Sequence, residues 1–304
     1  MSSADVLINE LKSLPCFTQI QSVDLLAHGL SQTAIKVTTA SQVFFAKKLN
    51  KNTASSEIVS ALLCSNVVPA STKKSALAPE VIYHDQEWLI TKFIDGITLT
   101  DDGFNAAEKT TIALKLMARL HQYTNTIPEN ALARLNTRHA IDSFLPNLTN
   151  SLANFSHTLT KVTHYLNNTI EQLIESSDCQ NVICHGDLNF SNILLETSQR
   201  VWLVDFECTH YAPREFDLAM FVAVNNISID NLDHLVTTYR GFRPNVKIHS
   251  QLLNHFILYS YFINGLWYLS KKHTSLAREQ WAAFDAFALK NTMNLPELLS
   301  IVNQ

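Results

Sequence analysis

Residues 184–217 read CHGDLNFSNILLETSQRVWLVDFECTHYAPREFD, and they hold most of the chemical information in the chain. Two short apolar runs, ILLE and RVWLV, flank a polar turn centred on Ser198, which is the pattern of a β-hairpin. Folding this hairpin brings Asn192 roughly opposite Asp205, and directly opposed residues lie about 4.5–5.5 Å apart. The open end of the hairpin is therefore expected to present an amide oxygen and a carboxylate together.

Amide and carboxylate oxygens are hard ligands that suit Mg²⁺, which completes its coordination with water and phosphate oxygens. We therefore predict Asn192 and Asp205 as metal ligands. Asp187 lies five residues before Asn192, in a loop after a short strand-like run. It can reach the same region without being bound to the metal, as a general base should. The segment thus predicts a general base close to a metal site.

The spacing H-x-D-L-x-x-x-N followed by D-F is similar to the catalytic loop and metal-binding aspartate of protein-kinase-like phosphotransferases. The wider set HGDLNFSNILL, VWLVDFE and EFDLA resembles the aminoglycoside phosphotransferase / choline kinase family over about residues 25–270. DFECTHYAPREFD most resembles the choline/ethanolamine kinase form, D-F-E-Y-x-x-Y-N-Y-R-x-F-D. Cys208 and Ala212-Pro213 depart from that form, so the acceptor-binding residues can differ from those of a choline kinase.

The resemblance implies a role for each matching residue of this segment. It makes Asp187 the catalytic base and His185 a brace of the catalytic loop. Asp217 is expected to be structural, accepting hydrogen bonds near a helix start. Glu207 faces the acceptor or the surroundings of the metal, with an ordinary surface glutamate as the alternative. NGLWYLS resembles the tryptophan-bearing helix of choline kinases, which assigns Trp267 to the acceptor.

The phosphate-binding lysine is expected on the strand-like run VFFAKKL, which offers Lys47 and Lys48. Successive side chains of a strand point to opposite faces, so only one of the two can point inward. Alignment of FFAK with the corresponding strand of the family favours Lys47. Its expected partner is Glu57 in the helical run SSEIVSALL, and the alternative for Glu57 is a solvated helix residue.

Two further segments resemble the nucleotide-binding parts of the family. HGLSQTAIKV looks like the nucleotide loop, and it contributes Gly29 and Ser31. LITKFIDGITL looks like the hinge strand, and it contributes Phe93 and a glycine at position 96. The resemblance implies ATP and Mg²⁺ as cofactors, while the choice between ATP and GTP depends on backbone contacts that a sequence does not give.

The predicted fold class is α+β, a two-lobed protein-kinase-like fold. An N-terminal nucleotide-binding lobe of antiparallel sheet is expected over residues 1–95, and a mostly helical lobe with the catalytic loop and acceptor site over 96–304. Hydrophobic periodicity predicts these elements: helices at 4–14, 55–63, 105–123, 155–176 and from about 216 onward, and strands at 34–38, 42–49, 80–84, 88–93, 181–184, 193–196 and 201–204.

Composition narrows the class of protein. The chain has 304 residues, 46% of them hydrophobic, and a formal net charge of −4, which gives no electrostatic case for nucleic acid or acidic lipid as a partner. Its six glycines are too widely spaced for a dinucleotide-binding or P-loop motif. The five scattered cysteines and the lack of a signal-peptide pattern predict a soluble cytoplasmic protein without a membrane span. Nothing in the sequence predicts the oligomeric state.

The C-terminal region bears on the acceptor. Residues 225–304 hold five acidic residues, seven Lys or Arg, and 11 of the 28 aromatic residues. A polycationic aminoglycoside would favour a strongly acidic pocket, whereas aromatic faces suit a quaternary ammonium or thiazolium cation. We predict a small-molecule kinase acting on a hydroxyl of a cationic metabolite of the choline, ethanolamine or thiamine type. The alternatives are an aminoglycoside or other alcohol phosphotransferase and a non-catalytic ligand-binding member of the fold.

A protein kinase is disfavoured because the interval between Asp205 and Asp217 is too short for an activation segment.

Overall fold

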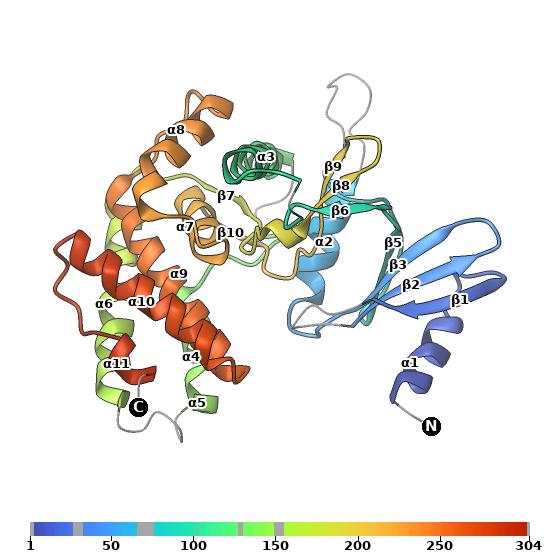
Figure 1. Cartoon of the computed structure of the whole chain (residues 1–304), viewed down its shortest axis with the longest axis horizontal. Coiled ribbons are helices and arrows are strands. Elements are labelled where there is room, and N and C mark those ends of the chain that lie inside the picture. The colour runs from blue at the N-terminus through green and yellow to red at the C-terminus, as the bar shows by residue number, and fades with distance from the viewer. Residues whose placement is uncertain are drawn as a thin grey trace. The chain divides into compact units, whose positions relative to one another are not determined.

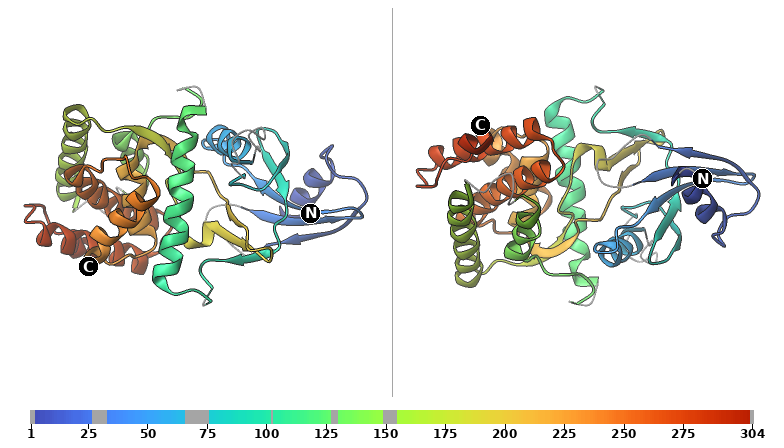
Figure 2. Two further views of the ribbon diagram at one scale, coloured as in Figure 1. Left: turned by 90° about the horizontal axis from the view of Figure 1, so that it is seen from above. Right: turned by 90° about the horizontal axis from the view of Figure 1, so that it is seen from below.

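The structure, a computed structural model, describes residues 3–26, 33–65, 76–101, 103–126, 130–148 and 155–302. Gly29 and Ser31 of the predicted nucleotide loop lie outside these residues. The chain divides into two compact units, and Figures 1 and 2 show the elements of each. The first unit comprises 1–105, 127–132 and 190–209, and the second comprises 106–126, 133–189 and 210–304.

A five-stranded antiparallel sheet forms most of the first unit, with strand order β1-β2-β3-β5-β4 (Figure 1). The predicted helix at 4–14, both predicted hairpins and the helix between them are present. The bounds are α1 Ser3–Lys12, β1 Ile20–Leu25, β2 Ala34–Thr39, β3 Val43–Lys48, α2 Ala54–Ser65, β4 Val81–His84 and β5 Trp88–Lys92.

The two faces of this sheet have different surroundings because side chains alternate along each strand. On one face, apolar side chains of β2, β3 and β5 form a buried cluster with Leu11 of α1. That cluster contains Ile35, Val37, Phe44, Ala46, Trp88 and Ile90. The opposite face carries Ala34, Phe45, Lys47, Leu89 and Thr91, which line a cavity. Strand alternation thus separates a packed face from a face open to a ligand.

The predicted hairpin after Asn192 is present, and its turn is centred on Ser198 as expected. Strands β8 Ile193–Glu196 and β9 Val201–Leu203 pair so that the N–H of Val204 donates to the carbonyl of Asn192 at 3.1 Å. Asn192 therefore lies opposite Val204, one residue from Asp205, in keeping with the rough opposition that was expected. Asp205 lies one position further on, and its φ of 65° turns the chain out of the strand. Strand β6 Gly96–Thr98 completes a three-stranded sheet by pairing with β8.

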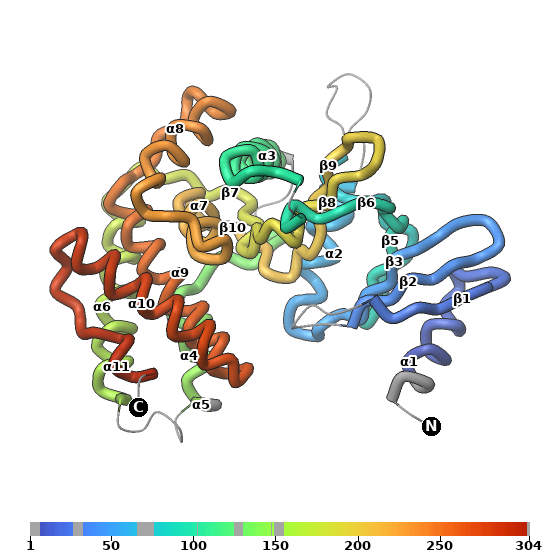
Figure 3. Tube along the Cα trace, viewed as in Figure 1, coloured from blue at the N-terminus to red at the C-terminus, as the bar shows by residue number. Residues whose placement is uncertain are grey.

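Helices dominate the second unit, in which α9 packs against both α7 and α10 (Figure 3). Strands β7 and β10 pair in an antiparallel two-stranded sheet. Of these two strands, β10 was not predicted from the sequence. Among the described residues, no helix combines the length and apolar character needed to cross a lipid bilayer. The bounds are α3 Ala106–Leu120, η1 His121–Thr126, α4 Thr137–Asp142, α5 Leu145–Leu148, α6 Ser156–Ser176, β7 Asn181–Cys184, β10 His210–Pro213, α7 Arg214–Val224, η4 Ile229–Asn231, α8 Leu232–Phe242, α9 Ser250–Ser270, α10 Thr274–Lys290 and α11 Leu299–Val302, while η3 Phe190–Asn192 belongs to the first unit.

Gly265 allows α9 and α10 to approach closely. A Cβ at this position would collide with the indole ring of Trp281, which is fully buried and donates to the carbonyl of Phe262 at 3.3 Å. We expect Gly265→Ala to lower the free energy of unfolding by about 2 kcal/mol, because overpacking a core costs typically 1–3 kcal/mol. Urea denaturation measures the change.

Gly241 of α8 supplies the matched control for Gly265. A Cβ there would meet no atom within 4 Å. Gly241→Ala should therefore leave stability unchanged or raise it by up to about 1 kcal/mol through helix propensity. Equal effects of the two alanines would contradict the packing argument at Gly265.

Candidate active site

Lys47 is the centre of a buried ion cluster in the first unit. Its Nζ lies 2.5 Å from Oε1 of Glu57 and 2.5 Å from Oδ1 of Asp205. The Lys47 and Glu57 side chains are 7% and 1% exposed, and the Asp205 side chain is 30% exposed. Strand β3 supplies the lysine, α2 the glutamate and the segment after β9 the aspartate. Residues predicted separately as a phosphate-binding pair and as a metal ligand are thus brought together.

The neighbouring lysine has a different environment. Lys48 points to the other side of β3, where its Nζ lies 2.8 Å from Oε2 of Glu10 and 2.8 Å from Oε2 of Glu87. All three of these side chains are partly exposed, so this cluster contributes little to stability. The lysine that enters the interior of the unit is Lys47.

Burial and charge act against each other in the Lys47 cluster. Burial disfavours the ionised carboxylate and raises the pKa of Glu57 to about 7, although Lys47 opposes the shift. Burial lowers the pKa of Lys47, but the charges of Asp205 and Glu57 outweigh it and leave that pKa raised. Lys47 is therefore a permanent cation held between two acidic side chains.

A cavity of about 470 Å³ adjoins this cluster, within the size range of small-molecule sites. One part is apolar and contains Phe93 of the predicted hinge strand. The polar part contains Lys47, Glu57, Asn192 and Asp205. The remaining apolar lining includes Leu26, Ala34, Phe45, Leu89, Ile94 and Phe206. Such a cavity can hold a flat apolar group against its apolar residues and an anionic group beside Lys47.

The carboxylate of Asp205 belongs to a group of oxygen donors of the kind that suits a divalent cation. Carboxylate oxygens of Glu57, Asp205 and Glu207 lie within 4.8 Å of one another, and Asn192 lines the same cavity as Asp205. These are hard oxygen donors, which Mg²⁺ prefers. The position of Glu207 beside Asp205 places it in the surroundings of the predicted metal site.

The loop that carries Asp187 belongs to the second unit, and helix α7 holds its first residues. The carboxylate of Asp217 accepts from the backbone N–H of His185 at 3.1 Å and of Gly186 at 2.9 Å. Gly186 has a φ of 75°, a conformation that favours glycine. His185 is fully buried and Asp187 is half-buried. The expectation that Asp217 accepts hydrogen bonds near a helix start is confirmed.

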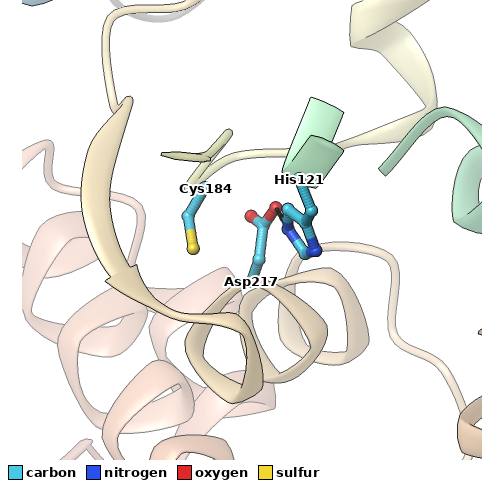
Figure 4. Close-up of side chains that lie close together, drawn as sticks. All are labelled: His121, Cys184 and Asp217. Carbon is cyan, nitrogen blue, oxygen red and sulfur yellow. Dashed lines mark hydrogen bonds and ion pairs between the residues drawn. The ribbon is translucent and has the colours of Figure 1, made fainter. Parts of the chain in front are cut away.

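A buried hydrogen-bonded chain leads from Asp217 to helix α8. Nε2 of His121 lies 3.0 Å from the Asp217 carboxylate (Figure 4). Nδ1 of His121 lies 2.7 Å from the hydroxyl of Tyr239. Burial lowers the pKa of His121. Burial opposes the charge on Asp217, but the bonds from His121 and Gly186 lower its pKa. We therefore assign an ionised Asp217 and a neutral His121 that donates from Nε2 and accepts from Tyr239.

Cys184 lies beside this chain, and Figure 4 shows its sulfur close to Asp217 and His121. The trio has the residue types of a metal site. However, Sγ of Cys184 donates to the carbonyls of Ala212 and Pro213 at 3.5 and 3.6 Å, and burial raises the thiol pKa far above its usual value. Because each side chain already has protein hydrogen bonds, the trio is a structural network. His121 falls within the helix predicted at 105–123, and nothing in the sequence singled out Tyr239 as its partner.

The last turn of α9 presents two aromatic residues in the second unit. The rings of Trp267 and Tyr268 meet edge to face at 5.0 Å, and both residues are half-buried. Burial raises the pKa of the Tyr268 phenol, and the charges of Asp187 and Glu279 raise it further. Tyr268 is therefore within the electrostatic reach of two carboxylates. The aromatic content of this region suggested such a surface but did not single out Tyr268 or Glu279.

A sequence profile of the phosphotransferase enzyme family matches residues 23–242. The chain belongs to this family. The profile covers both the Lys47 cluster and the loop that carries Asp187. No curated protein matches the chain with a significant score.

Solved structures of phosphotransferases share the fold of this chain. Choline kinase LicA from Streptococcus pneumoniae is 14% identical with a TM-score of 0.73, and the match covers 95% of this chain and all of that one. A choline kinase from Cryptosporidium parvum is 15% identical with a TM-score of 0.69, covering 99% of this chain and all of that one. A spectinomycin phosphotransferase in complex with ADP and spectinomycin is 16% identical with a TM-score of 0.57, covering 98% and 97%. The predicted kinase-like fold is confirmed.

Proposed function

We propose that this phosphotransferase transfers the γ-phosphate of ATP to a hydroxyl of a small cationic metabolite of the choline, ethanolamine or thiamine type. The observation that carries the proposal is Lys47, held between Glu57 and Asp205 at the polar end of a 470 Å³ cavity. A buried cation beside a largely apolar cavity suits a nucleotide, since the cavity accepts the base and the cation attracts the phosphates.

In this proposal, the apolar part of the cavity, including Phe93, accepts the nucleotide base, and Lys47 binds the phosphates. Asn192 and Asp205 would hold Mg²⁺, with Glu207 beside them. A metal held by these residues would supply positive charge that neutralises the phosphates. Glu57 holds Lys47 in place through their ion pair, and this role accounts for the burial of the glutamate side chain. ADP bound to the spectinomycin phosphotransferase of the same fold supports nucleotide use.

Asp187 is proposed to accept the proton of the acceptor hydroxyl. Its loop is fixed by hydrogen bonds from the backbone of His185 and Gly186 to Asp217, so the base is preorganised. His185 acts through this loop and not on the substrate. A carboxylate in this position raises the nucleophilicity of the hydroxyl as the phosphoryl group transfers.

The acceptor is proposed to bind beside Trp267 and Tyr268 of α9. Aromatic faces attract an ammonium group, and the carboxylates of Asp187 and Glu279 act on the same phenol. The negative charge of these two carboxylates and the two half-buried rings together favour a small acceptor that carries one positive charge and a hydroxyl close to it. Two choline kinases among the structures of the same fold support this class of acceptor.

A panel of acceptors tests the proposal directly. Purified protein is incubated with Mg²⁺ and ATP or GTP, and phosphate transfer is measured for choline, ethanolamine, thiamine, sugars, aminoglycosides and homoserine. We expect transfer to one of the first three, dependent on both nucleotide and Mg²⁺. If an aminoglycoside or an uncharged alcohol were the preferred acceptor, the proposed choline, ethanolamine or thiamine type of acceptor would be rejected in its favour. The absence of any transfer, with no thermal shift on adding Mg²⁺ and nucleotide, would favour a non-catalytic ligand-binding protein.

A further inference from the structure

The C-terminal end of helix α7 is joined to its surroundings by carboxamide side chains. The last turn of a helix leaves carbonyl groups without an intrahelical partner. Three of these carbonyl oxygens in α7 each accept an N–H from Asn or Gln. The pairs are Asn225 Nδ2 with the Phe221 carbonyl at 3.0 Å, Gln280 Nε2 with the Ala223 carbonyl at 3.2 Å, and Asn189 Nδ2 with the Val224 carbonyl at 3.3 Å.

Asn225 makes a second contact that reaches the loop of the proposed base. Its Nδ2 also donates to the carbonyl of Leu188 at 3.0 Å, and Leu188 follows Asp187 directly. The N–H of Asn189 donates to the carbonyl of Asp187 at 2.8 Å, which closes a tight turn. The carboxamides of Asn189 and Asn225 thus join this turn to α7 in both directions. We refer to these two side chains as the loop clasp.

The loop is consequently fixed to one helix on both sides of Asp187. Before Asp187, the carboxylate of Asp217 in the first turn of α7 accepts from the backbone of His185 and Gly186. After Asp187, the loop clasp fixes Leu188 and Asn189 to the last turn. Because an effective base needs correct placement, small displacements of such a loop reduce the rate strongly.

The same helix end is also connected to α9 and α10. Nε2 of Gln280 lies 3.3 Å from Oδ1 of Asn226, and Nδ2 of Asn264 lies 3.4 Å from Oε1 of Gln280. Gln280 belongs to α10 and is buried, and Asn264 belongs to α9 one turn before Trp267. The end of α7 therefore supports both the loop of the proposed base and the helices of the proposed acceptor side.

We propose that Asn225 is a positioning residue for phosphoryl transfer, which sets the placement of Asp187 through the carbonyl of Leu188. This inference rests on the proposed function. Asn225 acts on the reaction only through the loop and not through contact with either substrate. Its removal is expected to lower kcat while leaving the KM for nucleotide unchanged, because the nucleotide cavity is lined entirely by residues of the first unit.

Asn291 offers a matched control for Asn225. It follows α10 with backbone angles φ −95° and ψ 11°, compared with φ −104° and ψ 8° for Asn225 after α7. Its Nδ2 donates to the carbonyl four residues earlier, Phe287, at 2.9 Å, as Asn225 does to Phe221. Both residues are half-buried. The two differ in that Asn225 also donates to the catalytic loop.

The experiment compares Asn225→Leu, Asn225→Asp and Asn291→Leu in the full chain. With the best acceptor of the panel, we expect both Asn225 variants to lose about tenfold or more in kcat, since a displaced catalytic group can cost about 100-fold. Asp has the size of Asn but cannot donate, so it separates the lost hydrogen bond from lost volume. Asn291→Leu should keep kcat within about twofold while losing a similar helix-end contact. Equal kcat values for the two leucine variants would overturn the inference.

Hydrogen exchange supplies a readout that does not depend on activity. Peptides covering residues 185–190 should exchange faster in Asn225→Leu than in wild type, and should be unchanged in Asn291→Leu. If exchange of these peptides were unchanged in Asn225→Leu, the role of the loop clasp in fixing the loop would be rejected, whatever the kinase activity. Conversely, faster exchange together with no phosphate transfer by the wild-type protein would reject the proposed function and leave the loop clasp in place.

Discussion

Asp187→Asn should lower kcat by about 10²–10⁴-fold, the range that a positioned general base contributes. The amide has nearly the size of the carboxylate but cannot accept the proton of the acceptor hydroxyl. The cavity proposed to bind nucleotide belongs to the first unit and Asp187 to the second, so the dissociation constant for Mg²⁺-nucleotide should change by less than about threefold. Steady-state kinetics and calorimetric titration of nucleotide measure the two effects separately.

Asp178→Asn is the matched control for this variant. Asp178 is an exposed carboxylate of the same unit that pairs with Lys247 and His249 at 3.0 Å each. Its removal should leave kcat unchanged, because exposed ion pairs contribute little. Full activity in Asp187→Asn would reject Asp187 as the base. Comparable losses in both variants would point to a general effect of charge.

Lys47→Met should lower kcat/KM by about 100-fold or more, because it removes the cation proposed to bind the transferring phosphates. Methionine keeps an unbranched side chain of similar length in the buried position. The substitution also leaves Glu57 buried without its cation, so the pKa of Glu57 should rise further. Loss of one partner of a buried pair costs about 3 kcal/mol in the free energy of unfolding. Kinetics and urea denaturation test both parts.

Lys48→Met tests the same chemistry one residue away. Lys48 is partly exposed and pairs with Glu10 and Glu87, so its removal should change the free energy of unfolding by less than about 1 kcal/mol. It should leave the KM for nucleotide unchanged. A larger kinetic loss in Lys48→Met than in Lys47→Met would reverse the assignment of the two lysines. Addition of Glu57→Gln to Lys47→Met should recover stability but not activity, which separates the two roles of the lysine.

Local sequence patterns were sufficient to predict most elements of the fold. The alternation of VFFAKKL assigns one lysine to each face of a strand, and the structure has Lys47 inside and Lys48 outside. The run SSEIVSALL predicts a helix that faces the same sheet, and Glu57 emerges from it toward Lys47. These inferences succeed because period-two and helical patterns are local and each face has a distinct environment.

Other features depend on geometry that spacing alone does not determine. The hairpin turn centred on Ser198 followed from the sequence, but the left-handed conformations of Gln199 and Asp205 did not. The chain from Asp217 to Tyr239 joins residues far apart in sequence, so no local pattern could predict it. The same holds for Asn225 and Gln280, since carboxamides are common in loops and only the fold selects their partners. The roles of the predicted site residues and the boundary between residues 95 and 96 remain predictions.

Helix α9 has a consequence for handling the protein. Its 21 residues contain no Asp, Glu, Lys or Arg, and most of them are buried between α7, α6 and α10. Once the second unit unfolds, this uncharged segment is exposed to solvent and to other unfolded chains, without charges to keep them apart. Heating is therefore expected to end in aggregation, and the persistence of the protein at high temperature is then governed by how fast it unfolds.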